Sequence, residues 1–275
     1  MENLKNNILK TELTEKQVGV WYLGQEGFLF KNKDSYLAVD PYLSDYVDRN
    51  CSEYVNWKRN YEPPITPKEI AFVNVVLCTH SHYDHADPDT LSKIAANNSN
   101  TKFVIPAPCV ETVAGYGIDK ENIIPAKAFE EIDIEGYKII PIPSAHEELH
   151  SDEKGNYFEL GYVIKKNEQT FFHAGDMCMY DGLIQSLKKY DINIAFLPIN
   201  GRDYFRNNAD IIGNFNCEEA VLLAKEIGAK MLVPMHHDLY DVNCVSVESF
   251  VGVIKKYDAF RSYHIFSPGE LYVSV

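Results

Sequence analysis

The feature that most constrains this chain is an HxHxDH motif at residues 80–85, directly after the apolar run VNVVLCT at 73–79. His80 and His82 are two residues apart in an extended segment, so both rings project from the same side. The chain then turns, and Asp84 and His85 can face a second position close by. Three imidazoles and a carboxylate would make a poor core, whereas both groups are ligands of first-row metals. The motif therefore predicts a metal site at the end of a buried strand.

Three further candidate ligands stand at the ends of apolar runs. His146 follows YKIIPIP, Asp176 follows TFFHAG, and His236 follows AKMLVPM. A single His or Asp at the end of a strand more often has a structural role, but together with the HxHxDH motif these residues reinforce one another. All the donors are nitrogen or oxygen, which permits zinc, manganese or iron.

The order of the predicted elements indicates two packed sheets with helices outside them. VGVWYLG, FLFKN and SYLAVD read as an antiparallel meander, after which strands alternate with helices. Asp87 and Pro88 predict the start of one helix, and Gly228 predicts the end of another. We expect a single domain over residues 1–275, with the aromatic-rich segment 41–68 as a flap over the site. The predicted helices lie near 88–98, 108–115, 181–188, 218–227 and 247–256.

The charge balance limits the partners of this protein. The chain has 26 Lys and Arg against 40 Asp and Glu, a net charge of −14, which disfavours nucleic acid and anionic membranes. It has no apolar run of the roughly 18 residues that a membrane span needs, and its start does not resemble a secretory signal. The six cysteines are scattered without a CxxC pair. We therefore expect a cytoplasmic protein with reduced thiols and a small-molecule substrate; the sequence leaves a homo-oligomer open.

Together these motifs resemble the metallo-β-lactamase superfamily, whose ligands run HxHxDH, then His, Asp and His. The resemblance covers about residues 18–240 and implies an α/β fold, a four-layer αββα sandwich of two mixed sheets with helices on the outer faces. It also implies two divalent metal ions per chain. The ligands it implies are His80, His82 and His146 for the first ion, Asp84, His85 and His236 for the second, and Asp176 as the bridge between them.

Two more residues are candidates for supporting this metal site. Asp40, at the end of SYLAVD, matches an acidic residue that in the superfamily orients a metal-ligating histidine. His173 lies three residues before Asp176 and either supports the site in a similar way or belongs to the core.

A narrower resemblance is to the L-ascorbate-6-phosphate lactonase family. It rests on WYLGQEGFLF, on the extension of the HxHxDH motif to Asp87, on HAGDM, and on INGRD followed downstream by EEAVLLAKEIGAKMLVPMHHD. It implies a hydrolase that opens the lactone of a sugar-acid phosphate such as L-ascorbate 6-phosphate, and it favours Mn²⁺ over Zn²⁺. The substrate would then be a small anion.

The residues suggest how such a reaction would run. Two cations about 3.5–4 Å apart can share one water and lower its pKa from 15.7 toward about 7, which provides a metal-bridging hydroxide. Either Asp84 or His237 would protonate the departing alkoxide. Asn200, Arg202 and Arg206 follow the run INIAFLPI and are candidates for binding the substrate's phosphate. The alternative for each arginine is a structural pair with a neighbouring acid.

Two other functions compete with the lactonase hypothesis. The same scaffold hosts several hydrolytic reactions, so a phosphodiesterase or nuclease is the nearest alternative. The net charge of −14 and the lack of a basic patch count against RNA as substrate. A non-catalytic metal-binding scaffold would be expected to lack a ligand, and here the full set is present.

Overall fold

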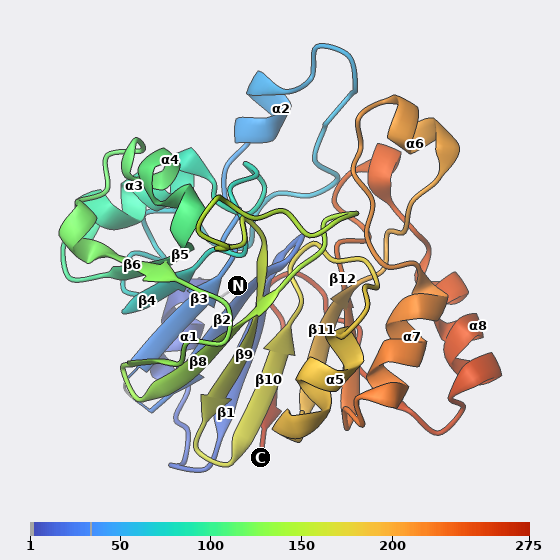
Figure 1. The fold of residues 1–275 in the computed structure, drawn as a ribbon. Coiled ribbons are helices and arrows are strands. Elements are labelled where there is room, and N and C mark those ends of the chain that lie inside the picture. The colour runs from blue at the N-terminus through green and yellow to red at the C-terminus, as the bar shows by residue number, and fades with distance from the viewer. Residues whose placement is uncertain (1–2, 34) are drawn as a thin grey trace.

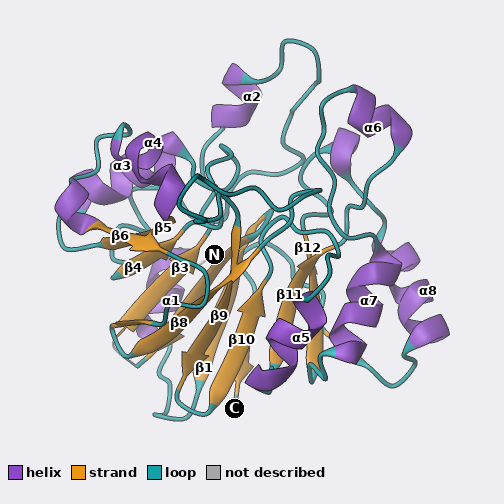
Figure 2. Ribbon diagram, viewed as in Figure 1, coloured by secondary structure: helices purple, strands orange, loops and turns teal. Residues whose placement is uncertain are grey.

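The computed structural model describes residues 3–33 and 35–275, which form two seven-stranded sheets with helices on the outer faces (Figures 1 and 2). This confirms the four-layer α/β arrangement predicted from the sequence. The first sheet has the spatial order β14 (Leu271–Ser274), β1 (Val18–Gly24), β2 (Gly27–Asn32), β3 (Ser35–Val39), β4 (Val75–Leu77), β5 (Lys102–Pro106) and β6 (Ile123–Ala126). The second has the order β13 (Ser262–Tyr263), β12 (Met231–Met235), β11 (Ile194–Pro198), β10 (Gln169–His173), β9 (Leu160–Lys166), β8 (Tyr137–Pro143) and β7 (Ile132–Ile134).

Both sheets are mixed, and their strand directions explain where the functional loops lie. In the first sheet β14 to β3 are antiparallel and β3 to β6 are parallel. In the second sheet β10 to β13 are parallel, and β8 runs in the direction of β10 because both are antiparallel to β9. The carboxyl ends of β8, β10, β11 and β12 therefore meet at one edge of the second sheet.

Aromatic side chains fill the space between the two sheets. Phe28 and Phe30 of the first sheet face Phe171 and Phe196 of the second, and all four are fully buried. The ring centroids of Phe28 and Phe196 lie 4.5 Å apart, and those of Phe30 and Phe171 lie 5.2 Å apart. Aromatic pairs at these separations contribute to stability beyond the area that they bury. This core fixes the two sheets, and hence the loops at their ends, relative to each other.

The helices cover the outer faces. Packing clusters join α1, α3 and α4 to the first sheet, and α5, α7 and α8 to the second. No helix within the described ranges is long and apolar enough to cross a membrane. The helices are α1 (Leu4–Lys10), α2 (Tyr46–Asn50), α3 (Pro88–Asn97), α4 (Val110–Ala114), α5 (Leu183–Leu187), α6 (Tyr204–Asn208), α7 (Cys217–Glu226) and α8 (Val247–Tyr257).

The helix boundaries follow local capping signals. The Asp87 side chain accepts a hydrogen bond from the backbone of Asp89, as predicted for the start of α3. At α7, Asn216 and Glu219 form a reciprocal capping box, and Gly228 follows the end of the helix with a φ of +69°. The helix α6 was not predicted from the sequence. It is a short helix of five residues that the Asp203 side chain caps. Five residues of helix carry too little periodicity to be recognised.

Candidate metal centre

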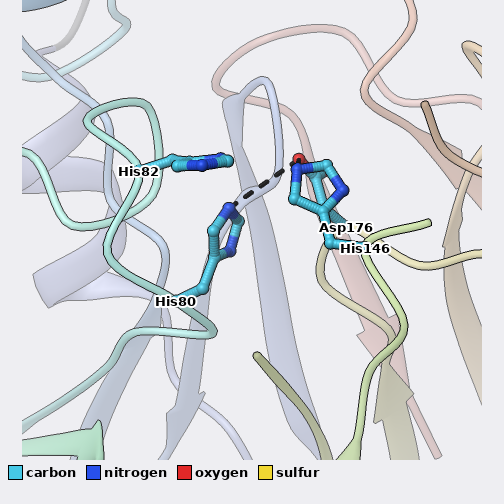
Figure 3. A group of neighbouring side chains, drawn as sticks. All are labelled: His80, His82, His146 and Asp176. Carbon is cyan, nitrogen blue, oxygen red and sulfur yellow. Dashed lines mark ion pairs between the residues drawn. The ribbon is translucent and has the colours of Figure 1, made fainter. Parts of the chain in front are cut away.

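Loops from both sheets bring one group of four candidate ligands together (Figure 3). His80 and His82 lie in the loop after β4, His146 follows β8, and Asp176 follows β10. One ligand atom from each lies within 4.8 Å of the others. Asp176 Oδ2 is 3.3 Å from His146 Nε2 and 3.8 Å from His80 Nε2. The three rings therefore gather around one carboxylate oxygen.

A second group of three candidate ligands adjoins the first. It consists of Asp84, His85 and His236, whose ligand atoms also lie within 4.8 Å of one another. Asp84 Oδ2 is 3.6 Å from His85 Nε2 and 3.6 Å from His236 Nε2.

Asp176 contacts both groups. Besides its contacts in the first group, its Oδ2 lies 3.4 Å from His85 Nε2 and its Oδ1 lies 3.4 Å from His236 Nε2. The structure thus places this carboxylate where a bridging ligand would have to be. All seven ligands implied by the resemblance are brought to one place.

The spacing and the unpaired atoms of both groups fit metal ions. Two ligand atoms bound to one ion at about 2.0–2.2 Å with tetrahedral angles lie roughly 3.4 Å apart. The nitrogen–oxygen separations of the two groups, from 3.3 to 3.8 Å, match that edge. His80 Nε2 and His85 Nε2 are buried without a hydrogen-bond partner, which is costly unless something else satisfies them. A cation would do so.

Burial keeps the histidines of the first group neutral. It lowers the pKa of His80 well below its usual value, lowers the pKa of His82, and lowers that of His146 to about 4. A neutral imidazole offers a lone pair to a metal, whereas a protonated one does not. These three rings are therefore in the binding state at neutral pH.

In the second group, facing carboxylates and imidazoles shift one another's pKa values. Burial alone would lower the pKa of His85 and of His236, but the carboxylates of Asp84 and Asp176 outweigh burial and raise both values. Burial likewise opposes ionisation of Asp84 and Asp176, but the facing imidazoles hold the pKa of each carboxyl below its usual range. Both carboxylates are thus charged, the form in which they bind cations.

Asp40 contacts one histidine of the second group and orients its ring. Its Oδ2 lies 2.8 Å from His85 Nδ1, while its carboxylate also accepts hydrogen bonds from the backbone and hydroxyl of Thr79 at 2.8 and 2.6 Å. A carboxylate at Nδ1 leaves Nε2 of the same ring free to bind a metal. This is the contact that the resemblance implied for Asp40.

His173 acts on the backbone next to a ligand and not on the ligand itself. Its Nε2 lies 2.8 Å from the carbonyl oxygen of Glu26, and its Nδ1 accepts from the amide of Gly175 at 3.2 Å. Gly175 has a φ of +63°, and a Cβ there would come within 2.7 Å of Thr79. Glycine and the histidine contact together set the turn that presents Asp176.

Sequence reasoning missed three buried polar residues near the ligands. Gln25 Nε2 lies 2.9 Å from Asp84 Oδ2 and 3.1 Å from His236 Nε2, and Asn214 donates to Asp176 Oδ1 at 2.7 Å. Glu26 is fully buried, with Oε2 at 3.8 Å from His85 Nδ1, and neither of its carboxylate oxygens has a hydrogen-bond partner. The polar pair in the otherwise apolar WYLGQEGFLF was a usable signal for Gln25 and Glu26, but no local pattern marks Asn214.

We predict that Gln25→Ala weakens metal binding at the second group by about tenfold, because it removes the contact that holds both Asp84 and His236. Isothermal titration of the metal-free protein with Mn²⁺ or Zn²⁺ measures this. Gln185→Ala, on the exposed face of α5, is the matched control and should titrate like the parent. Equal affinities in both variants would show that Gln25 does not position the ligands.

A cavity of about 470 Å³ opens over the two groups. The volume of the cavity and its position over the candidate ligands are usual for small-molecule sites. Five of the candidate ligands reach its surface. The cavity-lining ligands are His82, Asp84, His146, Asp176 and His236. Of the two proton-donor candidates, Asp84 lies on this surface, while His237 is buried and does not line it.

The three predicted substrate contacts do not reach this cavity. Arg202 makes two hydrogen bonds to the carboxylate of Glu219, at 2.8 and 2.6 Å. Arg206 pairs with Asp203 at 2.5 Å and donates to the carbonyl of Asn200 at 2.7 Å. Asn200 is itself buried. For both arginines the structure shows the structural pairing that the sequence had left as the alternative.

The segment 41–68 borders the cavity on one side. Its Trp57 lines the cavity, and its Tyr61 hydroxyl donates to Asp238 at 2.8 Å. The hydroxyls of Tyr42 and Tyr240 lie 2.7 Å apart. The segment is thus fastened to the loop after β12, and its motion as a flap stays a prediction.

With this geometry established, comparison with known proteins identifies the family. The model of the beta-lactamase superfamily domain matches residues 37–237, about three quarters of the chain and all seven ligands. The chain belongs to the beta-lactamase superfamily. The protein YhfI from Bacillus subtilis, solved as a metallo-β-lactamase fold protein, superposes with a TM-score of 0.67 at 18% identity, over 94% of this chain and 100% of that one. This likeness shows that the fold is the metallo-β-lactamase fold.

Two curated relatives are informative. A UPF0173 metal-dependent hydrolase of Saccharolobus solfataricus is 26% identical over 90% of this chain and 96% of its own length. A probable L-ascorbate-6-phosphate lactonase of Salmonella heidelberg is 23% identical over 64% of this chain, but the match spans only 52% of that protein. Family, relatives and ligand clusters agree on a metal-dependent hydrolase of the superfamily. They leave the substrate open.

Proposed function

We propose that this protein opens lactones with the help of two divalent metal ions, Mn²⁺ or Zn²⁺. The observation that carries the proposal is the pair of adjacent ligand groups sharing Asp176 at the floor of a small-molecule cavity. His80, His82 and His146 would hold one ion, and Asp84, His85 and His236 the other. When bound, such ions supply a hydroxide at neutral pH and polarise a carbonyl.

The protein's own residues would position and move the proton. Asp84 is ionised and lies on the cavity surface, where it can take the proton of the attacking water and pass it to the leaving alkoxide. Gln25 donates to the same carboxylate at 2.9 Å and so fixes its orientation. Asp40 acts as acceptor toward His85 Nδ1, and Asn214 donates to Asp176, so each of them orients one candidate ligand.

The lactone class rests on sequence similarity. The motifs resemble those of L-ascorbate-6-phosphate lactonases, and the Salmonella heidelberg protein is described as one. On this basis L-ascorbate 6-phosphate is the first substrate to test. The arginines expected to bind its phosphate are engaged elsewhere, so the similarity supports the lactone ring more strongly than the phosphate. The proposal requires neither nucleic acid nor a membrane as partner.

A turnover panel tests this proposal. The metal-free protein is reloaded with Mn²⁺ or Zn²⁺ and assayed on L-ascorbate 6-phosphate, on uncharged lactones and on bis(p-nitrophenyl) phosphate. We expect metal-dependent opening of at least one lactone and slower cleavage of the phosphodiester. Phosphodiester cleavage without any lactone opening would replace the proposal with a phosphodiesterase. Less than about one bound metal per chain would indicate a non-catalytic scaffold.

A further inference from the structure

The lining of the cavity combines apolar and polar side chains, and its charge distribution limits what can bind there. Among the described residues that line it, none is a lysine or an arginine. The apolar part of the wall consists of Val47, Trp57, Ile211, Ile212 and Tyr240, whereas Ser81, Thr112, Tyr116 and Asn243 contribute polar groups. The one charged residue of this wall that is not a candidate ligand is acidic, Asp210.

Two arginines close in sequence or contact to lining residues are bonded to other groups. Arg206 donates to the side chain of Asn243 at 3.0 Å and reaches the cavity only through that residue, which lines it. Arg59 donates to the carbonyl of Ser44 at 2.6 Å, and its guanidinium lies 4.5 Å from the ring centre of Tyr42. A phosphate held against the lining residues would lose hydration without contacting a lysine or an arginine among them, which is costly. The net charge of −14 adds to this penalty.

Exposed aromatic side chains lie on the segments that flank the cavity. Tyr204 and Phe205 on α6 are 75% and 82% exposed, and Tyr54, in the loop after α2, is 90% exposed. Figure 1 shows that α2 and α6 both stand beyond the ends of the strands, at the same end of the molecule. Trp57 and Ile212, from the same two segments, line the cavity itself. The ring centroids of Tyr204 and Phe205 lie 5.6 Å apart, and an exposed apolar pair beside a cavity is typical of a binding surface.

We propose that the site takes an uncharged lactone bearing an alkyl or aryl substituent, and not a phosphorylated one. The ring would lie over the His and Asp ligands and the substituent against the apolar wall. This rests on the proposed function. Water adds to the acyl carbon, the bond from that carbon to the ring oxygen breaks, and the ring oxygen takes the proton, so the product is a hydroxy acid with no change of oxidation state.

The first test compares two sets of lactones on the metal-loaded protein. For γ-lactones with alkyl chains of increasing length, we expect kcat/KM to rise about fourfold per methylene until the cavity is filled. Gluconolactone 6-phosphate should be opened no faster than gluconolactone. A phosphorylated lactone favoured by more than about tenfold would overturn the inference and leave the lactonase proposal standing. If no lactone is opened although metal is bound, the proposed function itself fails.

A substitution in the wall provides the second test. Ile212→Lys places a cation in the cavity at a residue that is 40% exposed, and Leu222→Lys, on α7 outside it at 37% exposure, is the matched control. We expect Ile212→Lys to lower kcat/KM for the octyl-chain lactone about tenfold and to raise kcat/KM for gluconolactone 6-phosphate. The control variant should change neither value. Unchanged selectivity in both variants would overturn the inference.

Binding can be followed without turnover. Of the two tryptophans, Trp57 lines the cavity and Trp21 is fully buried elsewhere. We expect 2-hexylcyclopentanone, an uncharged analogue that cannot be hydrolysed, to change tryptophan fluorescence saturably in the metal-free protein. Trp57→Phe should abolish the change and Ile212→Lys should weaken binding. No saturable change in the parent protein would contradict the placement of the substituent.

Discussion

Asp176→Asn is expected to lower kcat/KM at least about 1000-fold, the largest effect that we predict for one substitution. Both oxygens of Asp176 face imidazoles, Oδ2 at 3.3 Å from His146 Nε2 and Oδ1 at 3.4 Å from His236 Nε2. Asparagine is nearly the same size but uncharged, and only one of its two terminal atoms can accept a metal. The variant should therefore lose the ligand shared by the two groups while the fold persists.

Metal content and turnover are measured together for this variant. We expect at most one tightly bound ion per chain and a circular dichroism spectrum like that of the parent. Asp181→Asn is the matched control, because Asp181 is exposed and lies outside both ligand groups. A variant that retains two ions and turns over within about tenfold of the parent would show that Asp176 is not the shared ligand.

Asp40→Ala is expected to weaken metal binding about 10–100-fold and to lower the free energy of unfolding by about 1–3 kcal/mol. The carboxylate lies at 2.8 Å from His85 Nδ1 and accepts from the Thr79 amide, and all three residues are buried. Its removal frees the His85 ring to rotate and leaves the Thr79 amide without its acceptor. Competition with a chelator gives the first quantity and denaturant unfolding gives the second.

Asp40→Asn separates the two roles. Asparagine keeps an acceptor for the Thr79 amide and tolerates the φ of +42° at this position, so stability should return toward the parent value. The negative charge beside His85 is lost, so metal affinity should stay reduced. Full recovery of both would mean that the charge of Asp40 does not contribute to metal binding.

The convergence of the seven candidate ligands could be predicted from the sequence because their signals are local. His80 and His82 are separated by one residue directly after an apolar run, in a loop that bends instead of continuing the strand as expected, and His146, Asp176 and His236 each follow an apolar run of strand length. The strands that precede them belong to both sheets and end at the same end of the sandwich, which brings these residues together. The start of α3 was predictable for the same reason, since Asp87 and Pro88 are adjacent.

The residues around the ligands were harder to predict because their partners are distant in sequence. Arg202 forms an ion pair with Glu219 on α7, 17 positions later in the chain. Nothing in the INGRD segment indicates that pairing. Asn214 reaches Asp176 across 38 positions through the packing of two loops. The apolar character of the cavity wall combines residues of 41–68 with residues after α6, so it became visible only in the folded chain.

The origin of the ligands has a mechanical consequence. Each group takes residues from loops of both sheets: His80 and Asp84 follow β4 in the first, while Asp176 and His236 follow strands of the second. Bound ions would add links between the two sheets at this end of the sandwich, beside the backbone hydrogen bonds from Leu160 to Thr79 and from His236 to Gln25. We therefore expect chelation to accelerate amide hydrogen exchange in these loops before it affects the strands, so that the protein would loosen from this edge inward.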